Sequence, residues 1–190
     1  MKPPIAILLA LLLNLFSAGC AATDLKTLEP LEPRQAEPGV TINRAGHPIT
    51  LPLRSLADAT FVGSDGELIF YSDEKSLYAT VVTPEDWGNP DIQMNQAPAY
   101  IFQRDFSAVE DPELRKELEG IARMNLDAND GRELSVMAVG DITAYIAFSP
   151  EKSVIMLTSP DKPEQFSQLV LDRFRWEEIE NEVLKGIGVK

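Results

Sequence analysis

Runs of β-branched, aromatic and aliphatic residues alternate with turn-forming residues along most of the chain, and this pattern predicts short β-strands. Ser64-Asp65-Gly66 separates two such runs, and an Asp-Gly pair in that position is typical of a β-hairpin because both residues tolerate positive φ. Gly140-Asp141 predicts a second tight turn. The expected strands cover residues 60–63, 67–72, 76–83, 100–104, 133–139, 142–148 and 153–158.

Helical spacing appears in two places. Asp111-Pro112-Glu113 predicts a helix start, because Asp caps free amide groups and Pro fits the first helical position. Asp161-Lys162-Pro163-Glu164 resembles a capping box and predicts the last helix. The expected apolar stripes are Leu114, Leu118, Ile121 and Ala122 on the first helix, and Phe166, Leu169, Val170 and Phe174 on the last. Residues 176–187 either continue that last helix or form a second short one.

Strands in runs with helices after each run predict an α+β fold. We expect an antiparallel sheet of about six to eight strands, with two helices packed on one face. Leu118 and Phe166 are the expected core residues of those helices, because each lies centrally in its stripe.

The first twenty residues add information on targeting. Lys2 is followed by an apolar run from Ile5 to Leu13, which is too short to span a bilayer and is typical of a signal-peptide core. The run leads into Ser17-Ala18-Gly19-Cys20, which resembles the lipobox of bacterial lipoproteins, although Ser17 stands where that family favours Leu. The resemblance implies that residues 1–19 are removed and that Cys20 carries the lipid that binds the membrane. Ala21, where Asp would imply inner-membrane retention, implies the periplasmic face of the outer membrane. An ordinary leader that leaves a free thiol is the alternative.

Residues 20–47 form an acidic, proline-rich segment in which no apolar period develops. Such a segment buries little apolar surface, so we expect a disordered tether that is dispensable for folding. The alternative is that part of it packs on the domain as an irregular arm. A single globular α+β domain is then expected over residues 48–190.

The formal net charge of −13 limits the classes of partner. A surface this acidic repels nucleic acid and attracts cations or a basic partner. Cys20 is the only cysteine of the chain, so the domain itself has no disulfide and no thiolate nucleophile.

Few residues suggest catalysis or a cofactor. His47 is the only histidine, which leaves no triad and too few nitrogen and sulfur ligands for zinc. Asp127-Ala128-Asn129-Asp130-Gly131 resembles the start of a calcium loop. An EF-hand requires Gly and Glu where this chain has Arg132 and Ala138, so a turn is the better interpretation. We therefore expect no catalytic residue, no metal and no cofactor. A carboxylate-based hydrolase is an open alternative because acidic residues are plentiful.

Trp87 is a large aromatic residue in a loop rich in Pro, Gly and Asn. With Tyr100 and Phe102 on the expected strand 100–104, it is the candidate interaction surface, since loops and strand edges often hold binding residues. Packing of Trp87 on the core edge is the alternative. The sequence thus predicts a lipid-anchored accessory or protein-interaction domain of the cell envelope, non-enzymatic, with an envelope protein as partner. A small-ligand or cation-binding module, with its pocket between sheet and helix, is the second hypothesis.

Overall fold

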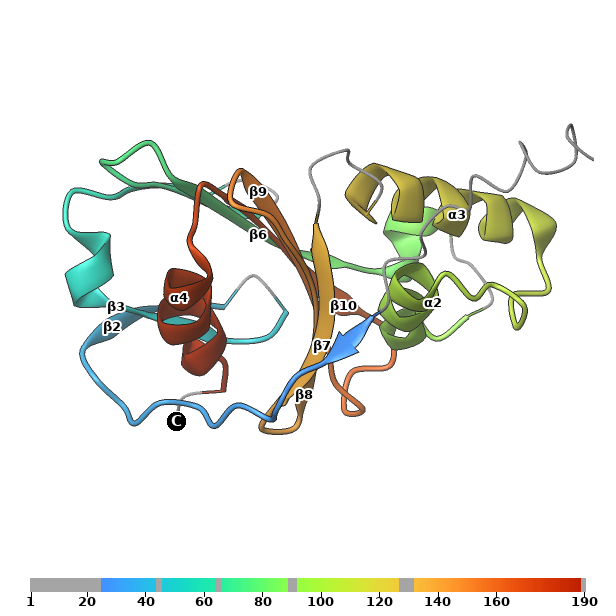
Figure 1. Ribbon diagram of the computed structural model, residues 1–190, viewed down its shortest axis with the longest axis horizontal. Coiled ribbons are helices and arrows are strands. Elements are labelled where there is room, and N and C mark those ends of the chain that lie inside the picture. The colour runs from blue at the N-terminus through green and yellow to red at the C-terminus, as the bar shows by residue number, and fades with distance from the viewer. Residues whose placement is uncertain (1–24, 44–45, 64–65, 89–91, 127–131, 189–190) are drawn as a thin grey trace, which may run out of the picture.

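The computed structural model describes residues 25–43, 46–63, 66–88, 92–126 and 132–188. In these ranges the chain is mixed α+β, with an eight-stranded sheet, a two-stranded sheet and short helices (Figure 1). The strands are β1 (Lys26–Thr27), β2 (Gly39–Ile42), β3 (Ile49–Pro52), β4 (Thr60–Gly63), β5 (Glu67–Phe70), β6 (Ser76–Val82), β7 (Glu133–Val139), β8 (Ile142–Phe148), β9 (Lys152–Thr158) and β10 (Phe166–Asp172). The α-helices are α2 (Ala97–Gln103), α3 (Pro112–Leu126) and α4 (Trp176–Glu178).

Shorter helical turns complete the described chain. The 3-10 turns are η1 (Leu53–Leu56), η2 (Pro84–Trp87), η3 (Met94–Gln96) and η5 (Leu184–Gly186). A π-helical turn, η4 (Ile179–Val183), joins α4 to η5, so the chain is helical from Trp176 to Gly186. None of the helices in the described ranges is long and apolar enough to cross a bilayer.

The large sheet has the strand order β1-β7-β8-β9-β10-β6-β5-β4. Two antiparallel meanders, β4–β5–β6 and β7–β8–β9–β10, are joined in the middle by the pairing of β10 with β6, in which Phe166 lies opposite Val82. Helices α2 and α3 lie between the two meanders in sequence. Among the strands of the described ranges, β1 alone is parallel to its neighbour, β7.

Most strands expected from the sequence are confirmed. The hairpin partners β4 and β5 pair on either side of residues 64–66, and β7 and β8 are joined through Gly140, whose φ of 56° suits glycine. The start of α3 is also confirmed, because the Asp111 carboxylate accepts a hydrogen bond of 2.9 Å from the backbone amide of Glu113.

The prediction of a strand over residues 100–104 is wrong. Residues 100–103 belong to helix α2, and Arg104 is its C-cap. Pro98 lies in the first turn of α2, where it requires no amide donor. Ala97, Ile101 and Phe102 are buried on one side of the helix, so packing determined the structure despite the β-type composition.

The last helix expected after residue 161 is also wrong over its first half, where β10 lies instead. Phe166, Leu169 and Leu171 are fully buried in this strand. Because β10 is a central strand with β6 on one side and β9 on the other, backbone pairing outweighs the helix-like spacing of its apolar residues. Leu118 and Phe166 are both core residues as expected, but Phe166 is on a strand.

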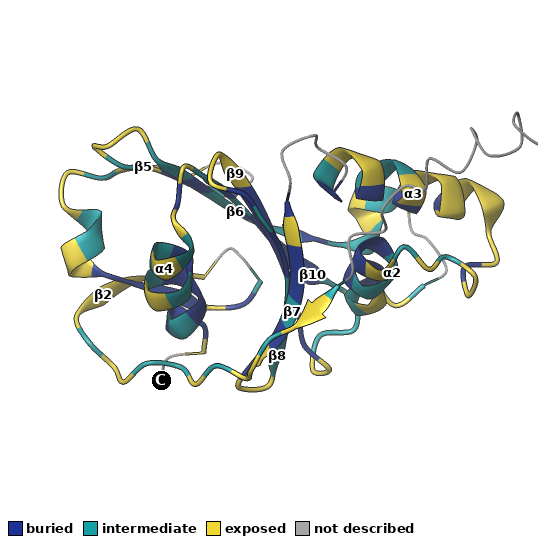
Figure 2. Cartoon of the chain, in the orientation of Figure 1, coloured by how far each residue is buried: buried dark blue, intermediate teal, exposed yellow. Residues whose placement is uncertain are grey.

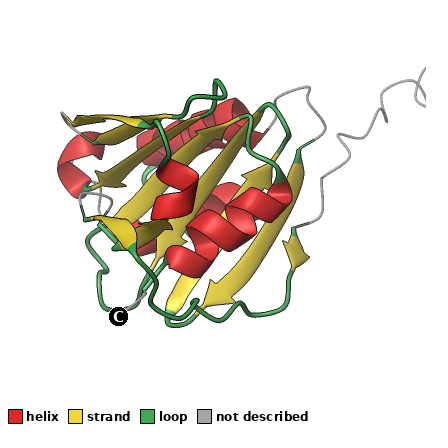
Figure 3. Cartoon of the chain, turned by 90° about the vertical axis from the view of Figure 1, so that its left-hand side faces the viewer, coloured by secondary structure: helices red, strands yellow, loops and turns green. Residues whose placement is uncertain are grey.

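Each face of the sheet carries its own core. Helices α2 and α3 pack on one face, over Leu134, Ala147 and Met156. The C-terminal helical segment and the small sheet β2–β3 pack on the other, over Ile146 and Leu169. Figure 2 shows the buried sides of these elements turned toward the sheet, and Figure 3 shows helices on both sides of it.

The described part of the expected tether lies against the domain. We call residues 25–38 the N-terminal arm. The amides of Leu28 and Leu31 donate to the carbonyls of Val136 and Ala138 on β7, and both leucines pack against the core. Beyond the arm, Ile42 on β2 is 3% exposed. The packed arm that the sequence left as an alternative is thus what residues 25–43 form.

Candidate functional site

Several positions considered in the sequence lie outside the described residues. These are the expected leader over residues 1–19, Cys20 as the expected lipidation site, Ala21, residues 64–65 of the expected turn, and the turn over residues 127–131 that resembles a calcium loop. Within the described ranges, no three or more His, Cys, Asp or Glu side chains come together in a way that could hold a metal ion.

Trp87, Tyr100 and Phe102 come together in one core rather than on a strand edge. Phe102 is 2% exposed and packs near Tyr145, with 5.6 Å between ring centroids. Trp87 is half-buried and meets the ring of Phe166 at 5.6 Å and 65°. Tyr100 is half-buried on α2 and donates its hydroxyl to Gln96 at 3.0 Å. The aromatic rings of Trp87 and Phe102 therefore mainly pack the core of the α2–α3 face.

His47 is buried rather than placed in a mobile segment. It is 2% exposed, and its Nδ1 lies 2.6 Å from the Ser167 hydroxyl on β10. Burial, assisted by the charge of Lys162, lowers the pKa of His47 to about 4. The imidazole is therefore neutral at pH 7 and inaccessible to a substrate from solvent. Its contact with Ser167 joins residues 46–48 to the sheet.

The main concave site lies between the N-terminal arm, the β7 edge of the sheet and the C-terminal helical segment. It is a groove of about 600 Å³, which we call the Trp176 groove. The arm, β7 and β8, and the helical segment each form one wall. The lining residues are Lys26, Leu28, Glu29, Pro30 and Leu31 from the arm, Glu133, Leu134, Ser135, Met137 and Phe148 from β7 and β8, and Trp176 and Glu180 from the helical segment.

An aromatic pair holds the floor of the Trp176 groove. Trp176 meets Phe148 edge to face, with 5.7 Å between ring centroids and 75° between ring planes. The helical segment begins at Trp176 because the Glu178 carboxylate accepts the Arg175 amide at 2.9 Å. Burial by itself would raise the pKa of Glu178, but hydrogen bonds from Arg175 and Lys75 outweigh it and lower this pKa to about 2.

The rim of the groove is charged and mostly acidic. Three carboxylates, on Glu29, Glu133 and Glu180, and one ammonium group, on Lys26, line the groove. Glu180 forms an ion pair with Lys185 at 3.2 Å. Among the described residues, no hydrogen bond or ion pair engages the side chains of Glu29 and Glu133, so both carboxylates are free to meet a ligand.

A second, smaller concavity of about 280 Å³ lies between η1, the β5–β6 turn and the helical segment. Two of its cations are paired within the chain, because Lys75 bridges Asp73 and Glu178 and Arg54 pairs with Glu37. Burial and the charge of Glu178 raise the pKa of Glu182. Because the concavity is smaller and its cations are already engaged, it is a weaker candidate for ligand binding than the Trp176 groove.

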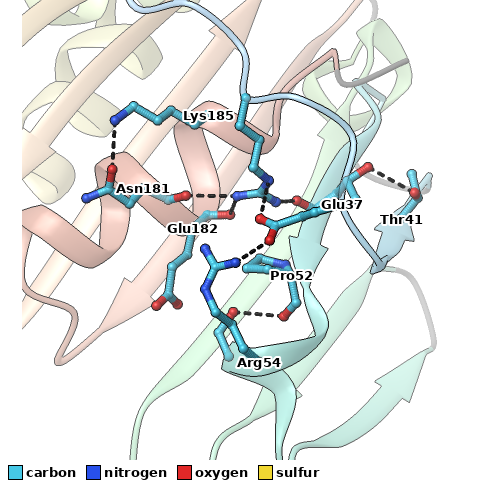
Figure 4. Close-up of polar contacts among 10 residues, drawn as sticks. Glu37, Thr41, Pro52, Arg54, Asn181, Glu182 and Lys185 are labelled. Atoms are coloured by element: carbon cyan, nitrogen blue, oxygen red, sulfur yellow. Dashed lines mark hydrogen bonds and ion pairs between the residues drawn. The ribbon is translucent and has the colours of Figure 1, made fainter.

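A cluster of polar contacts that includes Glu37, Asn181 and Glu182 joins the arm to the C-terminal helical segment (Figure 4), and Arg34 is at its centre. Arg34 Nη1 donates to the carbonyls of Asn181 at 2.8 Å and Glu182 at 3.2 Å, while Nη2 donates to the carbonyl of Thr50. The Arg34 amide also donates to Lys185 at 2.8 Å, and Nε pairs with Glu37 at 3.1 Å. One side chain therefore joins the arm, β3 and the end of the helical segment, and it holds one wall of the groove.

Sequence reasoning missed the Trp176 groove. It assigned Trp176 to a helix over residues 176–187, and at the start of that segment Arg175 pairs locally with Glu178 at 3.0 Å. The groove needs Trp176, Phe148 and the arm together, and these are far apart in the sequence. Comparison with protein-family models, curated protein sequences and solved structures finds no match for the chain.

Proposed function

We propose that the protein is a lipid-anchored, non-enzymatic binding domain of the bacterial cell envelope, and that its partner protein enters the Trp176 groove. In this proposal Cys20 carries the lipid, at the periplasmic face of the outer membrane. Helices α2 and α3 form the supporting layer on one face of the sheet, and the groove on the opposite face is the binding side.

The observation that supports the proposal most strongly is the groove itself. Its volume of about 600 Å³ lies within the ~300–1,000 Å³ common for ligand sites. It combines an aromatic pair with two carboxylates, Glu29 and Glu133, that have no side-chain partner among the described residues, which is the composition of many binding sites. Large aromatic residues that remain half-exposed, as Trp176 does, are frequent anchors for a partner.

The position of the groove also suits an anchored protein. The first groove residue of the arm, Lys26, lies six residues after Cys20. Fully extended, six residues span about 20 Å. The lipid would therefore hold the groove close to the membrane surface, where it meets other envelope proteins.

Photo-crosslinking in intact cells tests this function. A benzoylphenylalanine residue replaces Pro30, which is exposed on the groove wall, in the full chain. The control carries the same residue at Met124, which is 73% exposed on α3, on the opposite face. We expect a discrete crosslinked protein from position 30 and none from position 124, and we expect Cys20→Ala to leave the membrane fraction and reduce the crosslink.

The second hypothesis, a small-ligand module, is supported by the same groove because it lies between the sheet and a helical segment. It predicts no crosslinked protein at position 30, but a small molecule that copurifies with the chain and is lost in Trp176→Ala. Equal crosslinking at positions 30 and 124, or neither a protein nor a small molecule, would contradict a binding role for the groove.

A further inference from the structure

The walls of the Trp176 groove specify the charge of what it binds. Its rim carries three carboxylates and one ammonium group, and Glu29 and Glu133 have no side-chain partner among the described residues. A ligand that brings positive charge would neutralise these carboxylates. A ligand that brings negative charge would add repulsion in a partly enclosed site, where charges are poorly screened.

The apolar residues that line the groove indicate that its ligand has an apolar part. Met137, Phe148 and Trp176 lie along the floor of the groove. Aromatic faces attract both apolar groups and cations, and Lys and Arg side chains carry an apolar stem below a charged head. A basic side chain can therefore lay its stem on the aromatic pair while its charge reaches Glu133 or Glu29.

The size of the groove suits a short extended segment. One wall follows β7 from Glu133 to Met137. Five residues of strand rise about 13 Å, so roughly four or five extended residues of a partner can lie alongside this wall.

The charge of the whole chain narrows the choice of occupant. A net charge of −13 disfavours a second copy of this chain and anionic lipid head groups as ligands. The electrostatic field of this negative charge attracts a basic partner from a distance.

We propose, building on the proposed function, that the Trp176 groove recognises a short extended peptide segment of a partner protein in which Lys or Arg residues alternate with apolar residues. Glu29 and Glu133 bind the basic side chains. Trp176 and Phe148 contact their apolar stems and the apolar residues between them.

The test uses Trp176 as its own reporter. The mature chain carries Cys20→Ser and Trp87→Phe, which leaves Trp176 as the single tryptophan. Its fluorescence is titrated with a ten-residue peptide of alternating lysine and leucine, and with a peptide of alternating glutamate and leucine. We expect saturable binding of the lysine peptide only, weakened at least tenfold when the salt concentration rises from 50 to 500 mM.

A matched pair of double variants separates the groove from general attraction to an acidic protein. Glu29→Gln with Glu133→Gln removes two charges from the groove, and Glu117→Gln with Glu164→Gln removes two exposed charges elsewhere. We expect the first pair to weaken binding at least tenfold and the second to change it less than twofold. Equal loss in both pairs, equal binding of both peptides, or no response of Trp176 to either would overturn the proposal.

The two proposals can fail separately. A crosslinked protein at position 30 together with no preference for the lysine peptide would refute the charge specificity and leave the binding function supported. A missing crosslink at position 30 together with tight, Glu133-dependent binding of the lysine peptide would refute the cellular function and support the specificity of the groove.

Discussion

The indole of Trp176 lies edge to face against the ring of Phe148, with 5.7 Å between their centroids. This contact joins the last helical segment to strand β8, and both rings line the groove. The position of Trp176 therefore depends on Phe148, which is distant in sequence, as well as on the local contact between Arg175 and Glu178.

Replacing Phe148 by Ala should remove the ring contact that holds the Trp176 side chain in its position. An aromatic pair of this geometry contributes roughly 0.5–1.5 kcal/mol beyond its buried area, so we expect Phe148→Ala to lower the free energy of unfolding by about 2 kcal/mol. Urea denaturation measures this loss, and the emission of Trp176 should shift to longer wavelength in the folded state. Phe70→Ala, at a ring that is 48% exposed on β5, is the control and should cost less than about 1 kcal/mol. Equal losses for the two variants would show that the pair has no special role.

The hydrogen bonds of Arg34 should stabilise the packing of the N-terminal arm against the domain. Arg34→Ala leaves the carbonyls of Thr50, Asn181 and Glu182 without their donor, so we expect a loss of about 2–3 kcal/mol in the free energy of unfolding. Arg34→Lys keeps the charge but not the planar fork, so it should recover only part of this loss. Arg54→Ala is the matched control, because its side chain is 59% exposed and its ion pair among the described residues is with Glu37. If Arg34→Ala is no more costly than Arg54→Ala, the arm is not held by this cluster.

The segment before residue 47 should contribute to stability, contrary to what its composition suggests. Ile42 and Val40 lie on the same strand, β2, but Ile42 is 3% exposed and Val40 is 37% exposed. We expect Ile42→Ala to cost about 2–4 kcal/mol and Val40→Ala less than about 1 kcal/mol in chemical denaturation. Similar small losses for both would restore the view of this segment as a dispensable tether.

His47 should make folding sensitive to acid. The pKa of its imidazole falls from the ordinary 6.5 to about 4 in the folded chain, because burial and Lys162 disfavour the charged form. The unfolded state therefore binds the proton more readily than the folded state. The stability that the neutral His47 contributes is fully present above pH 6.5 and is lost as the pH falls toward 4. The loss amounts to about 3 kcal/mol.

His47→Gln isolates this effect. The variant cannot take up the proton, so its free energy of unfolding should change much less between pH 6.5 and 4 than that of the wild type. Glu178, with its pKa of about 2, titrates below this window, and the titration of the carboxylates is common to both proteins. Parallel stability curves for the two proteins would show that His47 is not the responsible group.

The sequence allowed most of the sheet to be predicted, because strands β4 to β9 combine β-type residues with turn residues that need positive φ, such as Gly140. It failed for β10, where Phe166, Leu169 and Val170 are spaced as on a helix. Pairing on both sides of that strand, which is a tertiary effect, outweighed the local pattern. For α2, a usable signal was present: Pro98 at the helix start, with Ala97 and Ile101 four residues apart.

The site was less predictable than the fold. Trp87 and Trp176 are the two tryptophans of the chain, and the loop around Trp87 looked the more exposed in sequence. In the fold, Trp87 packs on Phe166, which is distant in sequence, whereas Trp176 lines a groove that exists only because the arm returns to β7. No local pattern encodes that return, since Leu28 and Leu31 are isolated apolar residues among charges and prolines.

These two tryptophans allow the most direct test of the groove as the binding site. The crosslink from position 30 is measured in cells that produce Trp176→Ala or Trp87→Ala, and the melting temperature of each purified protein is measured alongside. Trp176→Ala should lower the crosslink yield by roughly tenfold or more at a temperature where it remains folded, as truncation of a binding anchor does, and loss of its contact with Phe148 should cost about 2 kcal/mol in the free energy of unfolding. Trp87→Ala should keep the crosslink at a temperature where it remains folded, but lower the free energy of unfolding by about 2–3 kcal/mol. The opposite result, an unchanged crosslink in Trp176→Ala and its loss in a folded Trp87→Ala, would contradict the groove and restore the surface around Trp87.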